Sequence, residues 1–455
     1  MKIKQVIQYF FLLGFLGASC TSIERYEPLN ITLSTKSPLG NKFSLSEKEI
    51  VEKAAQFFQK LEESGKDNAE TRSISSMNLS EKTPQVKMVI RTIRYGENDV
   101  EHVPVYVINY TVKRGNSTGG YVVMTGDQRL NSILVYSDSG SWGDNDPSIQ
   151  NFVNFFWENV DELIKRELAV NSLYPITKSR AIHLPCDFCY YYSEFDYIDN
   201  AKRLAQPALW SQLDPYNGKL APNCTPPPTG KSLYYPVGCW ATAMGQIMAY
   251  HQKPTSGSYT NYLGQTVNVT YNWNTMLTSQ YAGNLSSQGQ EMVQHLLAQI
   301  GQLQVLNNYG YYYPLMTYGC SDSGSDMYKA RQGFALMGYS TAPIGVDYDY
   351  NAVSSEIYAN RPVAADAWNI GSPFTKHAWV MDGVNSQTVV QTKYRYCPTV
   401  PTGVHNPIVE DILYSYINYV YCNLGAETPG NWNGYYRSDI FLPIQTETAI
   451  LTNIQ

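Results

Sequence analysis

Charged residues are scarce in this chain of 455 amino acids. Asp, Glu, Lys and Arg together make up 16%, and the net charge is −6 with no long basic stripe. The missing basic surface argues against nucleic-acid binding. The low charge, beside 43% hydrophobic residues, excludes a disordered polyelectrolyte. The length instead predicts two or three domains, each with a core of its own.

Cysteine and histidine are also sparse, with eight and six residues in the chain. Cys186 and Cys189 form a lone C-x-x-C without a second pair or nearby histidines, so we expect no zinc site, and no other metal or cofactor. A local disulfide and two free thiols are the alternatives for this pair. Four other cysteines are candidates for disulfides after export, in an order that the sequence leaves open: Cys224, Cys320, Cys397 and Cys422.

Long hydrophobic runs are missing except at the N-terminus. After two lysines, the apolar run from Val6 to Gly17 has the length of a signal-peptide core and is too short to span a membrane. Small residues then lead to Cys20, as in a bacterial lipobox. We therefore predict a signal with lipobox over residues 1–20, lipidation of Cys20, and a polar tether over residues 21–42. Plain secretion with cleavage near Ser19 is the alternative.

Three larger parts follow the tether. Residues 43–170 combine helical and strand patterns and predict a small α+β domain. Residues 171–205 contain proline, two cysteines and several basic residues, and we interpret them as a linker with a processing site. Residues 206–455 are long enough for one complete enzyme domain.

Within residues 43–170 the pattern predicts individual elements. Ser46 and Glu49 form a capping box at the start of a first helix. The polar stretch 64–85 is expected to be loop. Alternating and short apolar runs predict strands at 103–112, 121–124 and 133–136, and a long amphipathic helix is expected at 148–168.

The segment around Cys239 carries the most specific chemistry. Gly238 is a loop former, the residues after it are apolar at helical spacing, and Pro254 ends the pattern, so Cys239 lies in the first turn of a helix. The positive end of a helix dipole lowers the pKa of a thiol, and free N–H groups there stabilise an oxyanion. The alternative is a small buried cysteine at a helix start.

The residues from Gly238 through Gln246 to His251 resemble the nucleophile segment of the streptopain family of papain-like cysteine peptidases. The resemblance covers about residues 205–442, and more weakly residues 43–170, which resemble the family propeptide. It implies an α+β fold. A papain-like cysteine peptidase domain, with a helical half and an antiparallel β-sheet half, follows a small α+β propeptide domain. It also implies that Cys239 is the nucleophile.

Three further residues match the family pattern in the required order. Gln212, in a Q-x-x-P-Y-N stretch, is implied to be the oxyanion-hole side chain. His377, at the head of an apolar strand, is implied to be the general base, and Asn423 is implied to orient its imidazole. The alternatives are a loop glutamine, a buried core histidine and a turn asparagine before glycine.

Two departures from the family pattern touch this group. Leu424 follows Asn423 where the family has tryptophan, so the cover over the histidine is expected to be smaller. Lys376 precedes His377 where the family has glycine. A second register, with Asn431 followed by tryptophan, is possible for the orienting asparagine, but we prefer Asn423.

The resemblance implies an exported cysteine endopeptidase made as a zymogen, which cleaves peptide bonds through an acyl-enzyme intermediate. Its expected partners are protein or peptide substrates and its own propeptide as an intramolecular inhibitor. We expect membrane contact only through the lipid anchor, with the protein at the outer membrane or cell surface, or released after processing. Two alternatives stay open for this chain with 38 tyrosines: a catalytically weak relative that binds glycan or protein through a tyrosine-rich face, and a Cys–His cell-wall amidase.

Overall fold

The computed structural model describes seventeen stretches of the chain, all within the compact unit Ser34–Gln455. They are residues 43–65, 81–95, 100–112, 118–130, 133–143, 146, 149–173, 190–205, 208–225, 233–306, 311–320, 323–342, 345–369, 377–396, 408–426, 431–442 and 446–455. The predicted signal, Cys20 and the tether lie outside them. So do Cys186, Cys189 and Lys376.

The first part of the chain, residues 43–173, is called here the N-terminal module. Two helices flank a meander of four antiparallel strands. Its elements are α1 (Glu47–Gly65), β1 (Lys82–Arg94), β2 (Val100–Val112), β3 (Thr118–Thr125), β4 (Ile133–Ser137) and α2 (Gln150–Leu173). The capping box is confirmed, because the Glu49 carboxylate accepts hydrogen bonds from the backbone and hydroxyl of Ser46. Strand β1 was not predicted, and the loop expected at 64–85 is wrong from Lys82 onward. The apolar residues of β1 do not alternate strictly with polar ones, and only Pro84 and Ile93 are buried along it.

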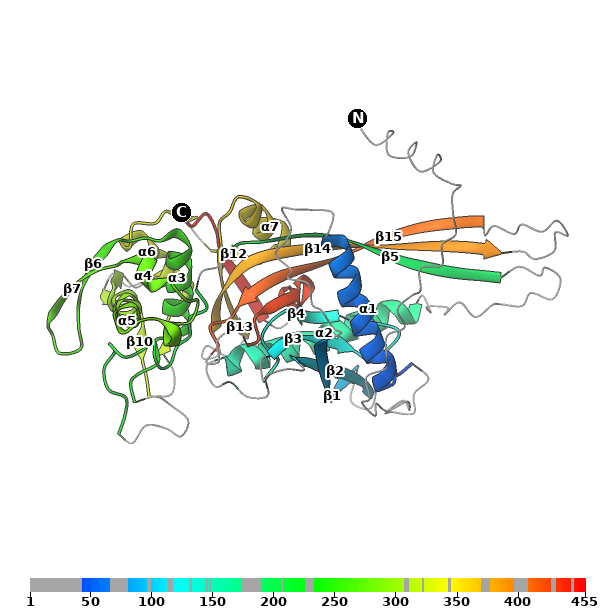
Figure 1. Cartoon of the computed structure of the whole chain (residues 1–455), viewed down its shortest axis with the longest axis horizontal. Helices are drawn as coiled ribbons and strands as arrows, with labels where there is room; N and C mark the ends of the chain where they lie inside the picture. The colour runs from blue at the N-terminus through cyan, green and yellow to red at the C-terminus, as the bar shows by residue number, and fades with distance from the viewer. Residues whose placement is uncertain are drawn as a thin grey trace, which may run out of the picture. The chain divides into compact units, whose positions relative to one another are not determined.

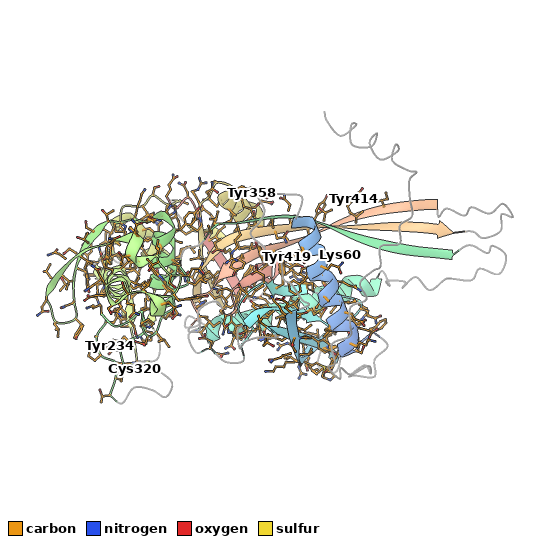
Figure 2. All side chains as sticks on the ribbon, viewed as in Figure 1. Lys60, Tyr234, Cys320, Tyr358, Tyr414 and Tyr419 are labelled. Atoms are coloured by element: carbon orange, nitrogen blue, oxygen red, sulfur yellow. A yellow bond between two sulfur atoms is a disulfide. The ribbon has the colours of Figure 1, made fainter. Side chains whose placement is uncertain are left out.

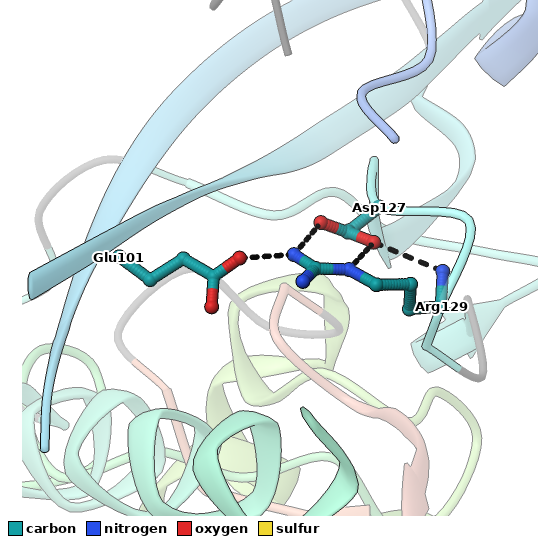
Figure 3. Close-up of polar contacts among 3 residues, drawn as sticks. All are labelled: Glu101, Asp127 and Arg129. Carbon is teal, nitrogen blue, oxygen red and sulfur yellow. Dashed lines mark hydrogen bonds and ion pairs between the residues drawn. The ribbon is translucent and has the colours of Figure 1, made fainter. Parts of the chain in front are cut away.

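Arg129 links the chain before α1 to this meander. Figure 3 shows its contacts with Asp127 and Glu101. Arg129 donates to both oxygens of Asp127 and forms an ion pair with Glu101 on β2. Its guanidinium lies 4.4 Å from the ring centroid of Phe43, and the backbone N–H of Gln128 donates to the Phe43 carbonyl. The chain segment that enters α1 is therefore held against the end of β3.

Residues 190–455 are called here the C-terminal module. Helices and small hairpins form one half of this module. They are α3 (Cys239–His251), β6 (Ser256–Thr260), β7 (Thr266–Thr270), α4 (Trp273–Met276), η4 (Ala282–Asn284), α5 (Ser287–Gln302), β8 (Gln304–Leu306), β9 (Tyr312–Pro314), β10 (Thr317–Tyr318), β11 (Ser323–Gly324) and α6 (Met327–Leu336). The other half is built on a sheet. It contains β5 (Tyr190–Arg203), β12 (Val346–Asp347), α7 (Tyr350–Tyr358), β13 (Val363–Asn369), β14 (His377–Tyr396), β15 (Ile408–Asn423), β16 (Gly434–Arg437), η5 (Ser438–Phe441) and β17 (Thr446–Leu451). This is the predicted helical half plus antiparallel half.

The sheets of the two modules are continuous. Strand β4 pairs antiparallel with β16, with Tyr136 opposite Tyr435 and Val135 opposite Tyr436. The order is β1-β2-β3-β4-β16-β15-β14-β13-β17-β12, with β5 also paired to β14. The sequence predicted two separate units. Backbone pairing joins them because the edges of β4 and β16 satisfy each other's hydrogen bonds.

Part of the predicted linker is a strand. Strand β5 pairs with residues 383–396 of β14, along the edge where β13 pairs with residues 377–381. Together β5, β14 and β15 form a long ribbon (Figure 1). The tyrosine-rich stretch at the start of β5 suits a strand, since aromatic side chains favour pleated surfaces.

Three buried clusters hold these layers together, each named here after its helix. The α2 core packs α2 against one face of the sheet and includes Trp379 and Met381 of β14. The α1 core packs α1 on tyrosines of β15 and β16. The α3 core fills the helical half and includes Ala378 and Val380 of β14. Alternate residues of β14 thus point into different cores, as the two-residue period of a strand requires. None of the helices in the described ranges has the length and apolarity needed to cross a membrane.

Candidate active site

Cys239 begins helix α3, as predicted. The N-cap residue is Gly238, with φ 90° and ψ 145°, and its carbonyl accepts from the N–H and the hydroxyl of Thr242. Only glycine adopts this φ without strain. A Cβ at this position would also lie 2.1 Å from the Met316 methyl and 2.9 Å from the Ser323 carbonyl. The backbone that presents the thiol is therefore tightly enclosed.

The thiol of Cys239 is free and buried, with 8% of the residue exposed. Burial raises its pKa to about 12, helped by the nearby charge of Asp366. Hydrogen bonds from the backbone N–H of Ala378 and from the first turn of α3 act in the opposite direction. The sequence predicted a lowered pKa. In this state burial outweighs the helix dipole, so the sulfur is protonated and a poor nucleophile.

Gln212 lies on the loop that runs beside the start of α3. Its carbonyl accepts from the N–H of Val237, two residues before Cys239, at 2.8 Å. The loop is also held by α3 itself, since the Gln246 amide donates to the Trp210 carbonyl at 2.8 Å. Gln212 is buried beside the loop that leads to Cys239. The structure therefore brings these two predicted residues together.

His377 begins β14 next to the thiol, but its imidazole points into the α2 core. Nε2 lies 3.0 Å from the carbonyl oxygen of Leu424, and the ring stacks on Trp379 at 14°. The ring centroid of Phe152, on α2, is 5.8 Å away. The following residue, Ala378, faces the α3 core that contains Cys239. The predicted thiol–imidazole contact is thus replaced by a bond to Leu424, because consecutive side chains of a strand face opposite sides.

Asn423 ends β15 and is buried beside α3. Its Nδ2 donates to the Ala208 carbonyl at 3.2 Å, and its Oδ1 accepts from Gln246 at 3.3 Å and from Asn433 at 3.1 Å. The expected bond to His377 is not made here, since the imidazole bonds to the carbonyl of the next residue instead. Asn423 pairs with Val380 and shares its face of the sheet. Asn423 therefore lies on the same side of the sheet as Cys239.

Of the two departures, Lys376 lies outside the described residues, whereas Leu424 and the second register can be placed. Leu424 is buried in the α2 core, where its carbonyl holds the imidazole. Trp432 packs on Trp142 of the N-terminal module at 4.2 Å, and Asn431 accepts from Ser141 of the same module. Asn431 therefore contacts the N-terminal module, whereas Asn423 contacts α3. The choice of Asn423 as the orienting residue stays a prediction.

Several residues around the site were not predicted. Phe152, Asp146 and Asn433 have no local motif, and only the folded arrangement brings them near His377 and Asn423. Gln246 had a usable signal, because it follows Cys239 by two helical turns on the predicted helix. The described residues include no cluster of His, Cys, Asp or Glu arranged to hold a metal ion.

A disulfide joins two chain segments beside the loop that leads to Cys239. Cys224 and Cys320 are bridged, and the Asn223 amide donates to the Cys320 carbonyl at 3.1 Å. Figure 2 labels Cys320, one end of this bridge, and Tyr234, which pairs with Pro222, two residues before the other end. One of the pairings left open by the sequence is thereby settled, while Cys422 is free and buried.

The buried imidazole makes a testable contribution to the pH dependence of stability. Burial lowers the pKa of His377 to about 4, opposed by its bond to Leu424 and by Asp146. Between pH 6.5 and 4 the unfolded chain therefore binds a proton that the native protein excludes, so stability falls as the pH falls. Each pH unit in this window costs about 1.4 kcal/mol.

The measurement uses the full chain carrying Cys239→Ala, with and without His377→Gln. Their difference in unfolding free energy cancels other titrating groups, including Asp382, whose pKa burial raises to about 7 against the effect of Arg203. From pH 7.5 to 5 the histidine form should lose about 2 kcal/mol relative to the glutamine form. A constant difference would show that the imidazole is not held neutral.

Comparison with known proteins agrees with this geometry. The family model for the peptidase C10 family matches residues 210–436, and the model for the Spi protease inhibitor matches residues 43–164. The chain belongs to the peptidase C10 family of cysteine peptidases and is a streptopain-like zymogen whose N-terminal module is the inhibitor region.

Two curated relatives and one solved structure illustrate the relationship. Streptopain of Streptococcus pyogenes is 26% identical over 385 residues, which cover 76% of this chain and 80% of streptopain. The thiol protease/hemagglutinin PrtT of Porphyromonas gingivalis is 35% identical over 101 residues, 20% of this chain and 10% of that protein. A fragment of prointerpain A from Prevotella intermedia is 18% identical, with a TM-score of 0.45 over 80% of this chain and 98% of the fragment.

Proposed function

We propose that this protein is an exported cysteine endopeptidase in its latent precursor form. Cys239 is the nucleophile, His377 the general base, Asn423 the residue that orients the imidazole, and Gln212 the oxyanion donor. One observation carries the proposal. The thiol at the start of α3 lies against the backbone N–H of Ala378, one residue from an imidazole held on the other face of the sheet.

The N-terminal module explains why that imidazole is turned away. Phe152 of α2 and Trp379 of β14 both lie beside the ring and contact each other, and Asp146 lies near it. Departure of α2 would remove one wall of this site and expose the Leu424 carbonyl to water. The imidazole could then turn to the thiol, because a short change at the head of β14 suffices to reverse one side chain.

The chemistry after this change follows from the groups around the sulfur. The imidazole takes the thiol proton, and the resulting imidazolium stabilises the thiolate, which lowers the pKa that burial now raises. The thiolate attacks the peptide carbonyl, while the Gln212 amide and a first-turn N–H of α3 hold the oxyanion. His377 then protonates the leaving amine, and water hydrolyses the acyl-enzyme with the same imidazole as base.

The boundaries predicted from the sequence complete the proposal. The signal and lipobox occupy residues 1–20, with Cys20 lipidated, and the exported protein is held at the outer membrane or cell surface until processing. The inhibitory domain covers residues 43–170 and the peptidase residues 206–455. Of the interval 171–205, the β5 portion has its backbone paired to β14, which protects it from cleavage. Processing is therefore expected before Tyr190.

The experiment compares the precursor, its processed product and the Cys239→Ala variant. Each is incubated with an epoxide thiol inhibitor and then with casein. We expect labelling of Cys239 and casein cleavage only after the precursor loses about 20 kDa, and neither in the variant. A wild-type protein that never matures or labels would contradict the proposal and favour a binding protein. A labelled protein that spares casein and cuts muropeptides would favour an amidase.

A further inference from the structure

Asn433 makes two side-chain hydrogen bonds at the predicted active site. Its Oδ1 accepts from the backbone N–H of Leu424 at 2.9 Å, and its Nδ2 donates to Oδ1 of Asn423 at 3.1 Å. The residue is buried, so water does not compete for these bonds. One amide thus holds both the side chain of Asn423 and the backbone of its neighbour.

We propose that Asn433 is a positioning residue, which sets the Asn423 amide so that its oxygen, and not its nitrogen, is available to the imidazolium of His377. This inference rests on the function proposed above. Asn433 touches no reacting atom. It acts through Asn423, and through Leu424, whose carbonyl holds the imidazole in the latent state.

Backbone groups determine the polarity of this network. The Leu424 N–H can only donate, so Asn433 must present oxygen to it and nitrogen to Asn423. The Ala208 carbonyl can only accept, so Asn423 must present nitrogen to it. Both ends therefore require the same orientation of the Asn423 amide. An imidazolium needs an acceptor, and this orientation supplies the oxygen.

Gln246 is the other side chain that bonds to the Asn423 oxygen, and its bond indicates the position that the imidazole of His377 takes on activation. It donates to the Asn423 oxygen at 3.3 Å and to the Trp210 carbonyl at 2.8 Å. The bond to Asn423 is the longer one and the weaker. We expect the imidazole to replace this bond on activation, while the bond from Asn433 at 3.1 Å remains.

The N-terminal module also holds the turn that carries Asn433. Tyr121 donates to the Asn433 carbonyl at 3.0 Å, and the Trp432 N–H donates to the Ser141 carbonyl at 3.0 Å. These bonds are lost when the module leaves. The side-chain hydrogen bonds of Asn433 are then a larger fraction of the contacts that hold the turn in place. Its removal should therefore disturb the processed enzyme more than the precursor.

The test uses enzyme processed from full-length precursor, with a catalytic amount of wild type added where a variant fails to mature itself. Asn433→Ala should lower kcat roughly 10- to 100-fold with KM changed less than about threefold, since a misplaced catalytic group costs rate. Asn433→Asp should lose as much, because a carboxylate cannot donate to Asn423. Asn431→Ala is the matched control in the same turn, and its activity should stay within about twofold.

A second readout separates positioning from structural damage. The rate of Cys239 alkylation by iodoacetamide against pH reports the thiolate–imidazolium pair. Its acid limb should move up by about one pH unit in Asn433→Ala, because the imidazolium loses an oriented acceptor. Wild-type kcat in this variant, or a lower kcat with an unmoved acid limb, would overturn the inference. If wild type itself neither labels nor cleaves, the proposed function fails first.

Discussion

Replacing His377 with alanine should lower kcat/KM of the processed enzyme by about 10⁴- to 10⁶-fold, the range for loss of a member of a nucleophile–base pair. Without the imidazole, no base takes the thiol proton, and burial keeps the pKa of Cys239 high, at about 12 in the present structure. Self-processing of the precursor should stop as well. The measurement is hydrolysis of a fluorogenic peptide, with processing followed by gel.

The control for this variant is His295→Gln. His295 lies on α5, where its Nδ1 is 2.8 Å from the Tyr259 hydroxyl. It is not one of the residues proposed for the active site. Its replacement should leave kcat/KM within a few-fold of wild type. Retention of more than about a tenth of the activity in His377→Ala would show that another group is the base, and an equal loss in both variants would indicate general damage.

Replacing Phe152 with alanine should activate the precursor before processing. The ring is buried, 5.8 Å from His377, 5.2 Å from Trp379 and 5.4 Å from Tyr436. Truncating a buried phenylalanine costs about 3–5 kcal/mol. If this cost falls on the latent arrangement alone, the population with a released imidazole rises by about 10²- to 10⁴-fold. The rate of epoxide labelling of uncleaved precursor measures this change.

Phe58→Ala is the matched control for the latency prediction. Phe58 is also a buried phenylalanine of the N-terminal module, but its ring packs on Phe57 and Tyr110 of the same module. Both variants lose the same atoms, and only Phe152 touches the imidazole. Equal acceleration of labelling would mean that loosening of the whole module, and not release of His377, controls latency.

In this arrangement, the latent form and the proposed active form of the site differ little in structure. Helix α3, the Gln212 loop and Asn423 are already joined by hydrogen bonds in the precursor. Of the four proposed site residues, His377 has its side chain on the opposite face of the sheet from Cys239, and the N-terminal module covers it there. Because consecutive strand residues face opposite sides, reversing one side chain at the head of a strand separates an inactive site from an active one.

Several features were predictable because they depend on near neighbours in the chain. The Ser46–Glu49 capping box and the start of α3 at Cys239 follow from spacing within a few residues. Others were missed for the opposite reason. Strand β1 has few buried residues and lacks a clear apolar face, and β5 becomes a strand only because β14 offers an edge.

The sequence by itself determined which side chains we propose for the chemistry: a cysteine at a helix start, a histidine at a strand head, and the asparagine and glutamine that accompany them. Local spacing and the chemical identity of side chains suffice for that. Only the tertiary structure decided the state of the site. Whether His377 faces the sulfur or Phe152 depends on which module covers each face of the sheet, and that is a balance of packing between residues more than 200 positions apart, such as 152 and 377.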